Sequence, residues 1–456
     1  MKSSRTPDSK RDSNRNPLPF SERLSAPTLL TLGIIGVLVS ATAALDAFGF
    51  IPAGSTENRL SVSQIRNWGL MNTQGNSHIS AVDAWKIEEG SSEILVAVID
   101  TGIDPNHPDL ARNVWREGKK EKVDQELAEL NPSLPGQLTP GISRARANLV
   151  AGSPLAGLIG SPLLPKQNSA AHFKESHSGR LNAASSPISS QNKSRDSGIF
   201  GWNFVNNQAN PLDDHGHGTH VAGIIGAVAN PRTGVSGVAH RVSILPIKYY
   251  SDSNPGSVNL RNTVRAIHYA IDKGARIINY SGGGPEFSEE EFLAIKRAES
   301  KGILVVSAAG NENQNTDLRE NFYYPAAYRL KNIISVAATN IHNQLLTSSN
   351  WGKRSVDVAA PGENIYSTLP GGRYGTMSGT SQATAFVTGI AALLLSKNPS
   401  LKPEELKEII MHSVDRFPQI EERVASGGRV NAYRALKLLL QKQPSLAQAP
   451  SVQRSS

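Results

Sequence analysis

The chain has 456 residues, 38% of them hydrophobic, which is long enough for one large α/β domain with additional segments. It contains no cysteine, which excludes disulfide bonds, thiol catalysis and lipid attachment at an N-terminal cysteine. The net charge is +8, but most of the excess falls in residues 1–25 and 116–197. The rest of the chain is nearly neutral, so we expect no nucleic-acid partner.

The beginning of the chain has the pattern of an export signal. Residues 1–27 form a charged N-terminal region, and residues 28–50 are apolar with no charge before Asp46. A basic flank followed by an apolar run predicts export with the N-terminus left inside. Residues 41–43 (Ala-Thr-Ala) fit a signal peptidase site, yet the run is also long enough for a marginal membrane span. A cleaved signal and a retained anchor therefore stay open. Either one leaves the following domain outside the cytoplasm, secreted, periplasmic or membrane-anchored.

Predicted strands and helices alternate along most of the remaining chain. Strands are expected at 94–99, 243–248, 276–280, 303–307, 333–337 and 356–359. Helices are expected at 217–229, 259–273, 288–300, 381–396, 403–414 and 431–441. This alternation predicts a three-layer α/β fold, with a mostly parallel central sheet and helices on both faces.

Two segments do not fit this alternation. Residues 117–197 are rich in Ser, Asn, Pro and Ala, and the apolar part at 149–165 is interrupted by prolines. We predict a disordered insertion there, with a lid, an autocleavage segment or a partner-binding arm as alternatives. The polar residues 442–456 are predicted to be a flexible tail.

Residues 96–102 (Val-Ala-Val-Ile-Asp-Thr-Gly) predict a buried parallel strand that ends in an acid. Asp100 then lies at the carboxyl end of the strand, where open α/β sheets place ligands and catalytic groups. Downstream, His215, His217 and His220 stand among glycines and threonine where a helix begins. Zinc is disfavoured because there is no cysteine and the spacing from His217 to His220 is not that of a zinc helix.

Residues 379–384 (Gly-Thr-Ser-Gln-Ala-Thr) directly precede a long apolar run. Ser381 is therefore expected in the first turn of a buried helix, beside backbone N–H groups that have no intrahelical acceptor. Such a serine is either an ordinary helix cap or a nucleophile next to an anion site. The acid and the histidine upstream favour the nucleophile.

Together, these three segments resemble the subtilisin-like serine peptidases (subtilases), in the chain order Asp, His, Ser. The resemblance covers residues 60–115 and 198–440 and implies a subtilisin-like peptidase domain over 60–441. It implies that Ser381 is the nucleophile, His217 the general base and acid, and Asp100 the carboxylate that orients the histidine. Residues 305–312 resemble the segment that supplies the oxyanion donor, which is here Asn311.

The resemblance also implies a substrate site along glycine-rich segments, where an extended peptide pairs with a strand edge. The residues expected to line it are Ser281, Gly282, Gly283, Ala308, Ala309 and Gly310. Gly282 replaces a bulky residue of the family, which is expected to open one wall. Tyr323 is expected either to fill the base of the pocket or to pack near it.

The sequence departs from the family in the serine segment and offers one candidate calcium site. Gln382, Thr384, Ala385 and Phe386 replace the usual Met, Ser, Pro and His, without loss of the Gly-Thr-Ser core. Calcium, in a structural role, is expected on Asp109 and on oxygens of the following loop, from Val228, Asn230, Thr233 and Val235. A second calcium site of the family is expected to be absent.

We therefore predict an exported serine endopeptidase that acts on polypeptides, is monomeric, needs no cofactor for catalysis and touches a membrane only through its N-terminal segment. It is also expected to fold without a family-type pro-domain, because the resemblance to the catalytic domain already begins near Trp68. A catalytically silent binding module of the same fold is the alternative from another class. An esterase or a peptide ligase with the same triad is the alternative among enzymes.

Overall fold

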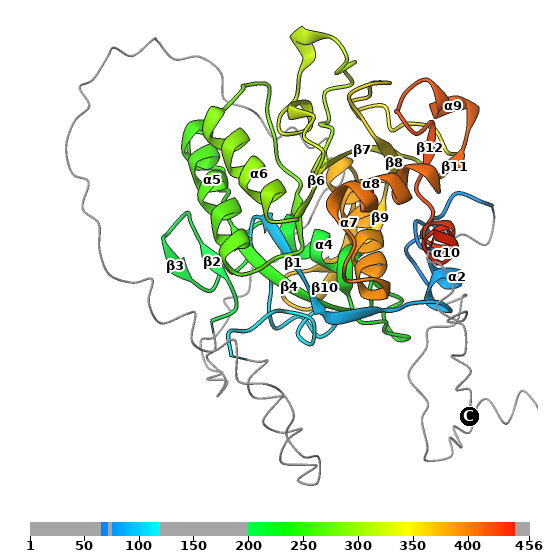
Figure 1. Ribbon diagram of the computed structural model, residues 1–456. Coiled ribbons are helices and arrows are strands. Elements are labelled where there is room, and N and C mark those ends of the chain that lie inside the picture. Colours follow the sequence, from blue (N-terminus) through cyan, green and yellow to red (C-terminus); the bar gives the residue numbers. More distant parts are fainter. Residues whose placement is uncertain (1–64, 72–74, 119–198, 443–456) are drawn as a thin grey trace, which may run out of the picture. The chain divides into compact units, whose positions relative to one another are not determined.

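A ten-stranded sheet runs through the centre of the molecule (Figure 1). The computed structural model of the protein describes residues 65–71, 75–118 and 199–442. The predicted signal or anchor at 28–50, nearly all of the insertion at 117–197 and the tail after residue 442 lie outside these residues. In spatial order the strands are β11 (Asp415–Arg416), β12 (Gly428–Arg429), β8 (Val358–Pro361), β7 (Ile333–Thr339), β6 (Leu304–Ala308), β5 (Ile277–Tyr280), β1 (Gly90–Asp100), β4 (Arg241–Lys248), β2 (Trp202–Asn203) and β3 (Gln208–Ala209). Neighbours pair in parallel from β12 to β2, and only the outermost pairs are antiparallel.

Alternation along the central strands sends side chains into two separate cores. In β1, Val96 and Val98 belong to one buried cluster, whereas Leu95, Ala97 and Ile99 belong to another. Successive residues of a strand point to opposite faces, so a continuous apolar run is what a sheet covered on both sides requires.

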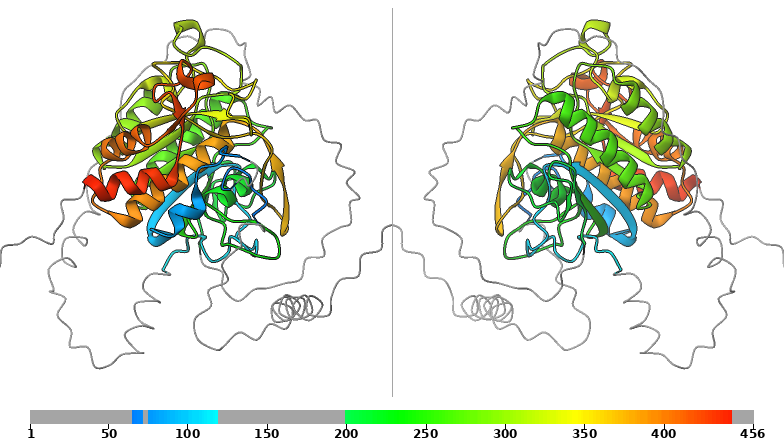
Figure 2. Two further views of the ribbon diagram at one scale, coloured as in Figure 1. Left: turned by 90° about the vertical axis from the view of Figure 1, so that its right-hand side faces the viewer. Right: turned by 90° about the vertical axis from the view of Figure 1, so that its left-hand side faces the viewer.

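Helices cover both faces of the sheet. One face carries α2 (Ala81–Trp85), α4 (His217–Gly226), α7 (Thr380–Lys397), α8 (Pro403–His412) and α10 (Ala432–Lys442). The other carries α5 (Gly256–Asp272) and α6 (Glu289–Ser300), which face the viewer in the right panel of Figure 2. The predicted three-layer α/β fold, with a mostly parallel central sheet, is thereby confirmed.

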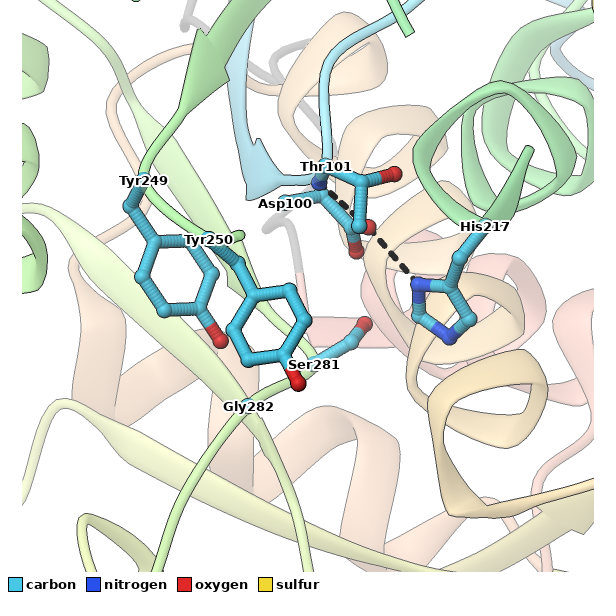
Figure 3. A pocket seen from close by; sticks show the side chains of 7 residues that line it. All are labelled: Asp100, Thr101, His217, Tyr249, Tyr250, Ser281 and Gly282. Atoms are coloured by element: carbon cyan, nitrogen blue, oxygen red, sulfur yellow. Dashed lines mark hydrogen bonds and ion pairs between the residues drawn. The ribbon is translucent and has the colours of Figure 1, made fainter. Parts of the chain in front are cut away.

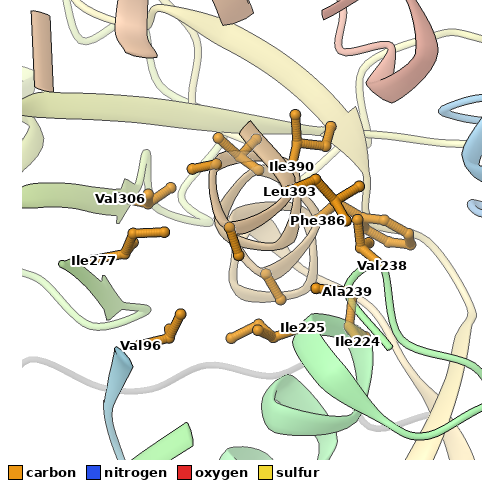
Figure 4. Close-up of a cluster of buried hydrophobic side chains, with 14 of the residues drawn as sticks. Val96, Ile224, Ile225, Val238, Ala239, Ile277, Val306, Phe386, Ile390 and Leu393 are labelled. Carbon is orange, nitrogen blue, oxygen red and sulfur yellow. The ribbon is translucent and has the colours of Figure 1, made fainter. Parts of the chain in front are cut away.

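Helix α7 lies in the middle of the larger core and is buried from its first residue to Leu395. Figure 4 shows it beside Val96, Ile277 and Val306 of three neighbouring strands. A Cβ at Gly389 would lie 2.4 Å from Val238 Cβ, so a glycine is needed there for close packing. The buried helix therefore has little freedom to move, which fixes the position of the residues at its N-terminus.

Each strand and helix predicted from the sequence is present, with ends shifted by a few residues. The prediction missed a two-stranded sheet of β9 (Ile365–Leu369) and β10 (Arg373–Met377), which is partly exposed and joined by a turn with Gly371 and Gly372 at positive φ. The paired glycines were the available signal for this hairpin. It also missed the short elements η2 (Arg319–Asn321), η3 (Ala326–Tyr328) and α9 (Pro418–Glu421). Within the described ranges, no helix is long and apolar enough to cross a membrane.

Candidate active site

Asp100 is the last residue of β1, which lies between β4 and β5 in the sheet. Its side chain is 4% exposed. The Oδ1 atom accepts a hydrogen bond from the backbone N–H of Thr101 at 2.8 Å and lies 2.7 Å from Nδ1 of His217 (Figure 3). A buried carboxyl needs such partners because burial removes its hydration. The strand thus directs a buried acid at Nδ1 of the imidazole ring.

His217 is the first residue of α4, and its side chain is 2% exposed. Glycines on both sides of it allow the helix to begin against the turn that follows β1. Gly216 has a φ of 104°, which favours glycine, and a Cβ at Gly218 would lie 2.1 Å from the carbonyl oxygen of Gly102. These glycines therefore bring the start of α4 close enough for His217 to reach Asp100.

Asp213 joins the same two segments, although it was not predicted from the sequence. Its Oδ1 accepts hydrogen bonds from Thr101 Oγ1 at 2.9 Å and from the backbone N–H of Gly216 at 2.8 Å. Its Oδ2 accepts from the backbone N–H of Thr219 at 2.9 Å. An acid just before a helix is a recognised signal because it pairs with unsatisfied N–H groups at the N-terminus, and it could have been noticed here.

Ser381 is the second residue of α7, and 4% of its surface is exposed. The N-cap position belongs to Gly379, so the interpretation of Ser381 as an ordinary helix cap is wrong. Its Oγ donates a hydrogen bond to the carbonyl oxygen of Ser281 at 3.3 Å. Ser281 in turn lines a pocket together with Asp100 and His217. The structure therefore brings Ser381 to the same edge of the sheet as the predicted acid and base.

Asn311 follows β6 and meets the N-terminus of α7. Its Oδ1 accepts hydrogen bonds from the backbone N–H of Thr380 at 3.0 Å and from Thr380 Oγ1 at 3.1 Å. Because the oxygen is held in this way, the amide nitrogen is the end left to donate to a ligand. The contact with Thr380 places that amide beside Ser381.

The predicted substrate residues form two adjacent backbone segments. Residues 281–283 follow β5, and residues 308–310 lie at the end of β6. The two strands are parallel neighbours with Tyr280 opposite Ser307, so the segments leave the sheet side by side. The structure thus brings together the residues predicted from the glycine-rich motifs.

The expectation that Gly282 opens one wall is wrong. A Cβ at Gly282 would lie 2.1 Å from Tyr249 Oη and 2.8 Å from Tyr280 Cε2. The space that a side chain at 282 would take is therefore already filled by Tyr249, which follows β4, the strand on the other side of β1.

Tyr249 and Tyr250 line the pocket at Asp100 and His217, although the sequence interpretation missed them. Together with Thr101 and Gly282, they complete the pocket at Asp100 and His217, where the two rings lie across from the imidazole (Figure 3). They directly follow β4, whose last residue, Lys248, is opposite Asp100 in the parallel ladder. The end of this strand was predicted, so its adjacency to β1 was the missing information.

The histidines near α4 do not form a metal site. His220 is fully buried, and its Nε2 lies 2.9 Å from the carbonyl oxygen of Ile365. Burial, with a smaller contribution from His217, lowers the pKa of His220 to about 3, so the ring is neutral. Among the residues the structure describes, no three His, Cys, Asp or Glu side chains are grouped so that they could hold a metal.

The predicted calcium residues do come together, but as a hydrogen-bonded network. Asp109 Oδ1 accepts from Asn230 Nδ2 at 2.6 Å, and Oδ2 accepts from Tyr374 Oη at 2.7 Å and from Thr233 Oγ1 at 3.3 Å. The carbonyl oxygen of Val235 accepts from the backbone N–H of Asn230 at 3.0 Å, and the N–H of Val228 donates to the carbonyl oxygen of Asp109. Calcium takes six to eight oxygen ligands, among which carboxylates contribute most of the charge. As arranged, these residues do not fit the ion, because both carboxylate oxygens of Asp109 and the carbonyl oxygen of Val235 already accept hydrogen bonds.

Comparison with known proteins shows the family of the chain. The sequence matches the model of the subtilase family over residues 91–434. The chain belongs to the subtilase family. As a member of this family it is a serine-type, subtilisin-like peptidase, and its substrates are polypeptides.

Relatives of this subtilase include proteases with different names. Thermitase of Thermoactinomyces vulgaris is 39% identical over 239 residues, which are 52% of this chain and 81% of the relative. The cell wall-associated protease of Bacillus subtilis is 38% identical over 51% of this chain and 25% of the relative. The major intracellular serine protease of the same bacterium is 39% identical over 46% of this chain and 66% of the relative. A solved structure of a cold-adapted subtilisin-like serine proteinase has a TM-score of 0.48 and 24% identity, and covers 75% of this chain and 87% of that chain.

Proposed function

We propose that the subtilase is an exported endopeptidase in which Asp100, His217 and Ser381 form the catalytic triad. The observation that carries this proposal is the 2.7 Å contact between His217 Nδ1 and Asp100 Oδ1, buried at the edge of the sheet where α7 presents Ser381. Asp100 accepts a hydrogen bond from Nδ1–H, which leaves Nε2 as the basic nitrogen of the ring.

In the proposed reaction, Ser381 Oγ attacks the peptide carbonyl carbon while its proton passes to His217 Nε2. The resulting oxyanion accepts hydrogen bonds from Asn311 Nδ2 and from the backbone N–H of Ser381. Collapse of this intermediate breaks the C–N bond, and the proton on His217 moves to the leaving amine. Water then hydrolyses the acyl-enzyme by the same steps, and Ser381 is regenerated.

Binding of the polypeptide is proposed to use residues 281–283. These follow a buried strand and have glycine at 282 and 283, so an extended peptide backbone can approach closely and pair with them. We propose one monomeric peptidase domain over residues 60–441.

Labelling by a fluorophosphonate probe tests the proposed mechanism. We expect the wild type to be labelled at Ser381 and to cleave casein, and Ser381→Ala to do neither. Ser396→Ala is the matched control, because Ser396 lies near the other end of the same helix. Its hydroxyl donates to the backbone carbonyl oxygen of Ala392, one turn earlier in that helix. An unlabelled wild type would contradict the mechanism and favour a silent binding module.

Export is proposed from the basic flank and apolar run in residues 1–50. Fractionation of cells that express the full chain tests it, with a variant carrying two arginines in residues 34–38 as the control. We expect the wild type outside the cytoplasm and the arginine variant inside. Release of a shortened chain would indicate a cleaved signal, whereas retention in the membrane would indicate an anchor.

A further inference from the structure

The space between residues 281–283 and residues 308–310, here called the slot, contains a side chain of the protein itself. A Cβ at Gly283 would lie 2.4 Å from Cε1 of Tyr323, and a Cβ at Gly310 would lie 3.0 Å from Cδ2 of the same ring. These atoms belong to opposite edges of the ring, so Tyr323 extends from one segment to the other. A glycine is needed at 283 because the ring takes the space of a side chain there. At 310 a Cβ would also lie 2.4 Å from Asn350 Nδ2 and 2.5 Å from Glu312 Oε2, so that glycine is needed for these contacts as well.

The backbone around Tyr323 is held in place. The next residue, Tyr324, pairs with Gly284 through two hydrogen bonds, of 2.7 and 3.0 Å. The carbonyl oxygen of Tyr323 accepts from the backbone N–H of Ala327 at 2.8 Å. The ring of Tyr324 packs against Tyr328, with 4.8 Å between ring centroids. Tyr323 therefore belongs to a segment that is hydrogen-bonded to the residue that follows Gly283.

The surroundings of the Tyr323 hydroxyl oppose its ionisation. Burial raises its pKa well above the usual value, and the carboxyl groups of Glu312 and Glu291 contribute in the same direction. Glu312 Oε2 would lie 2.5 Å from a Cβ at Gly310, and it is 2.6 Å from Asn350 Nδ2. The ring of Tyr323 is therefore neutral, and it takes up space that a long substrate side chain would need between the two segments.

We propose that Tyr323 occupies the slot for the substrate residue on the amino side of the scissile bond (P1), so that this subtilase cleaves after glycine, alanine and serine and rejects large P1 residues. This inference rests on the proposed function. The slot receives the P1 side chain only if Asn311 and Ser381, which adjoin it, act on the scissile carbonyl. A side chain with no carbon atom beyond Cβ can lie above the ring, whereas a leucine or phenylalanine would have to displace it. A single methylene changes kcat/KM by about 10- to 200-fold in a closed pocket, so we expect discrimination on the order of 100-fold.

Peptides that differ only at P1 test the inference. We would measure kcat/KM with Gly, Ala, Leu and Phe at P1 for the wild type, Tyr323→Phe and Tyr323→Gly. The concentration of active sites would be determined for each by fluorophosphonate titration. We expect the wild type to favour Ala over Phe by about 100-fold. Tyr323→Phe keeps the ring and should keep this preference, whereas Tyr323→Gly should raise kcat/KM for Phe so that it equals or exceeds that for Ala.

The outcomes separate this inference from the proposed function. A labelled wild type that prefers Phe or Leu at P1 overturns the inference and leaves the serine peptidase mechanism intact. Absence of both labelling and cleavage overturns the mechanism and the inference with it. If Tyr323→Gly does not fold, the inference is still tested by two results: the wild type must favour Ala over Phe at P1, and Tyr323→Phe must keep this preference.

Discussion

Two sides of the candidate active site, one around Asp100 and His217 and one around Tyr323, are built by different physical means. Around Asp100 and His217, positions are set by directional hydrogen bonds, from the N–H of Thr101 to the five donors that surround Asp213. Around Tyr323, positions are set by volume, because rings lie against glycine backbones. We call the side around Asp100 and His217 the polar side and the side around Tyr323 the packed side. In our proposals, the polar side carries the chemistry, and the packed side limits which substrate side chains fit.

The carboxyl groups of the two sides differ accordingly. Asp213 accepts from the hydroxyl of Thr101, and from backbone N–H groups and a hydroxyl at and just before the start of α4. Glu291 of α6 is 2% exposed, accepts from Tyr328 Oη at 2.8 Å, and lies among tyrosines. Burial raises the pKa of Glu291 to about 7. A carboxyl group on the packed side is therefore sensitive to pH near neutrality, and this contrast can be tested.

The largest effect is expected on the polar side, from Asn311→Ala. Loss of one oxyanion donor lowers kcat by about 10²–10³-fold, a range that itself includes data on members of this family. KM should change little, because the amide acts on the oxyanion of the transition state. Steady-state kinetics on a peptide with alanine at P1 would measure this.

Thr380→Ala provides a graded comparison for Asn311. It removes the 3.1 Å hydroxyl contact with Asn311 but keeps the backbone contact, so we expect a fall in kcat of about tenfold or less. An Asn311→Ala enzyme with the kcat of the wild type would show that Asn311 is not an oxyanion donor.

The next effect is on the packed side, from Glu291→Gln. The folded-state pKa of about 7 lies above the unfolded value of 4.5, so protonated Glu291 stabilises the fold at low pH. This stabilisation is lost as the pH rises from about 4.5 through 7, which amounts to roughly 2–3 kcal/mol between pH 5 and 8. The glutamine variant should lose that part of the pH dependence.

Urea unfolding at pH 5 and 8, in a Ser381→Ala background to prevent autolysis, measures the Glu291 effect. Glu290→Gln is the matched control, because Glu290 lies one residue earlier on α6 and is exposed. The control should follow the pH dependence of its parent. If Glu291→Gln follows it too, Glu291 does not titrate near neutrality.

A smaller effect is expected at the junction of the two sides, from Gln382→Met. Gln382 is 1% exposed, and neither its Oε1 nor its Nε2 has a hydrogen-bond partner among the described residues. Removal of an unpaired buried amide by an apolar side chain of similar volume should raise the free energy of unfolding by about 1 kcal/mol. Gln419→Met on the exposed surface of α9 is the control and should change it by less than about 0.5 kcal/mol. A destabilised Gln382→Met would show that the amide is satisfied, for example by bound water.

The smallest effect is expected at Asp109. Calcium at 100 times its dissociation constant would add about 2.7 kcal/mol to stability at a specific site. Because Asp109 already accepts from Asn230, Thr233 and Tyr374, we expect calcium and a chelator to affect a Ser381→Ala parent and its Asp109→Asn derivative equally. Thermal unfolding of both proteins measures this. Calcium stabilisation that disappears with Asp109→Asn would establish the site.

The sequence by itself determined the family, the alternation of strands and helices, and the residues of the proposed triad. These features are local: an apolar run that ends in Asp100, glycines around His217, and a small-residue helix start at Ser381. Each depends on the conformation of a few neighbouring residues, so a short segment carries the information.

Only the tertiary structure decided which spaces are filled. Tyr249 takes the space beside Gly282, Tyr323 that between Gly283 and Gly310, and donors surround Asp109. In each case residues from separate segments compete for one volume or one oxygen. Their distance in space depends on the order of strands in the sheet, which no local pattern contains.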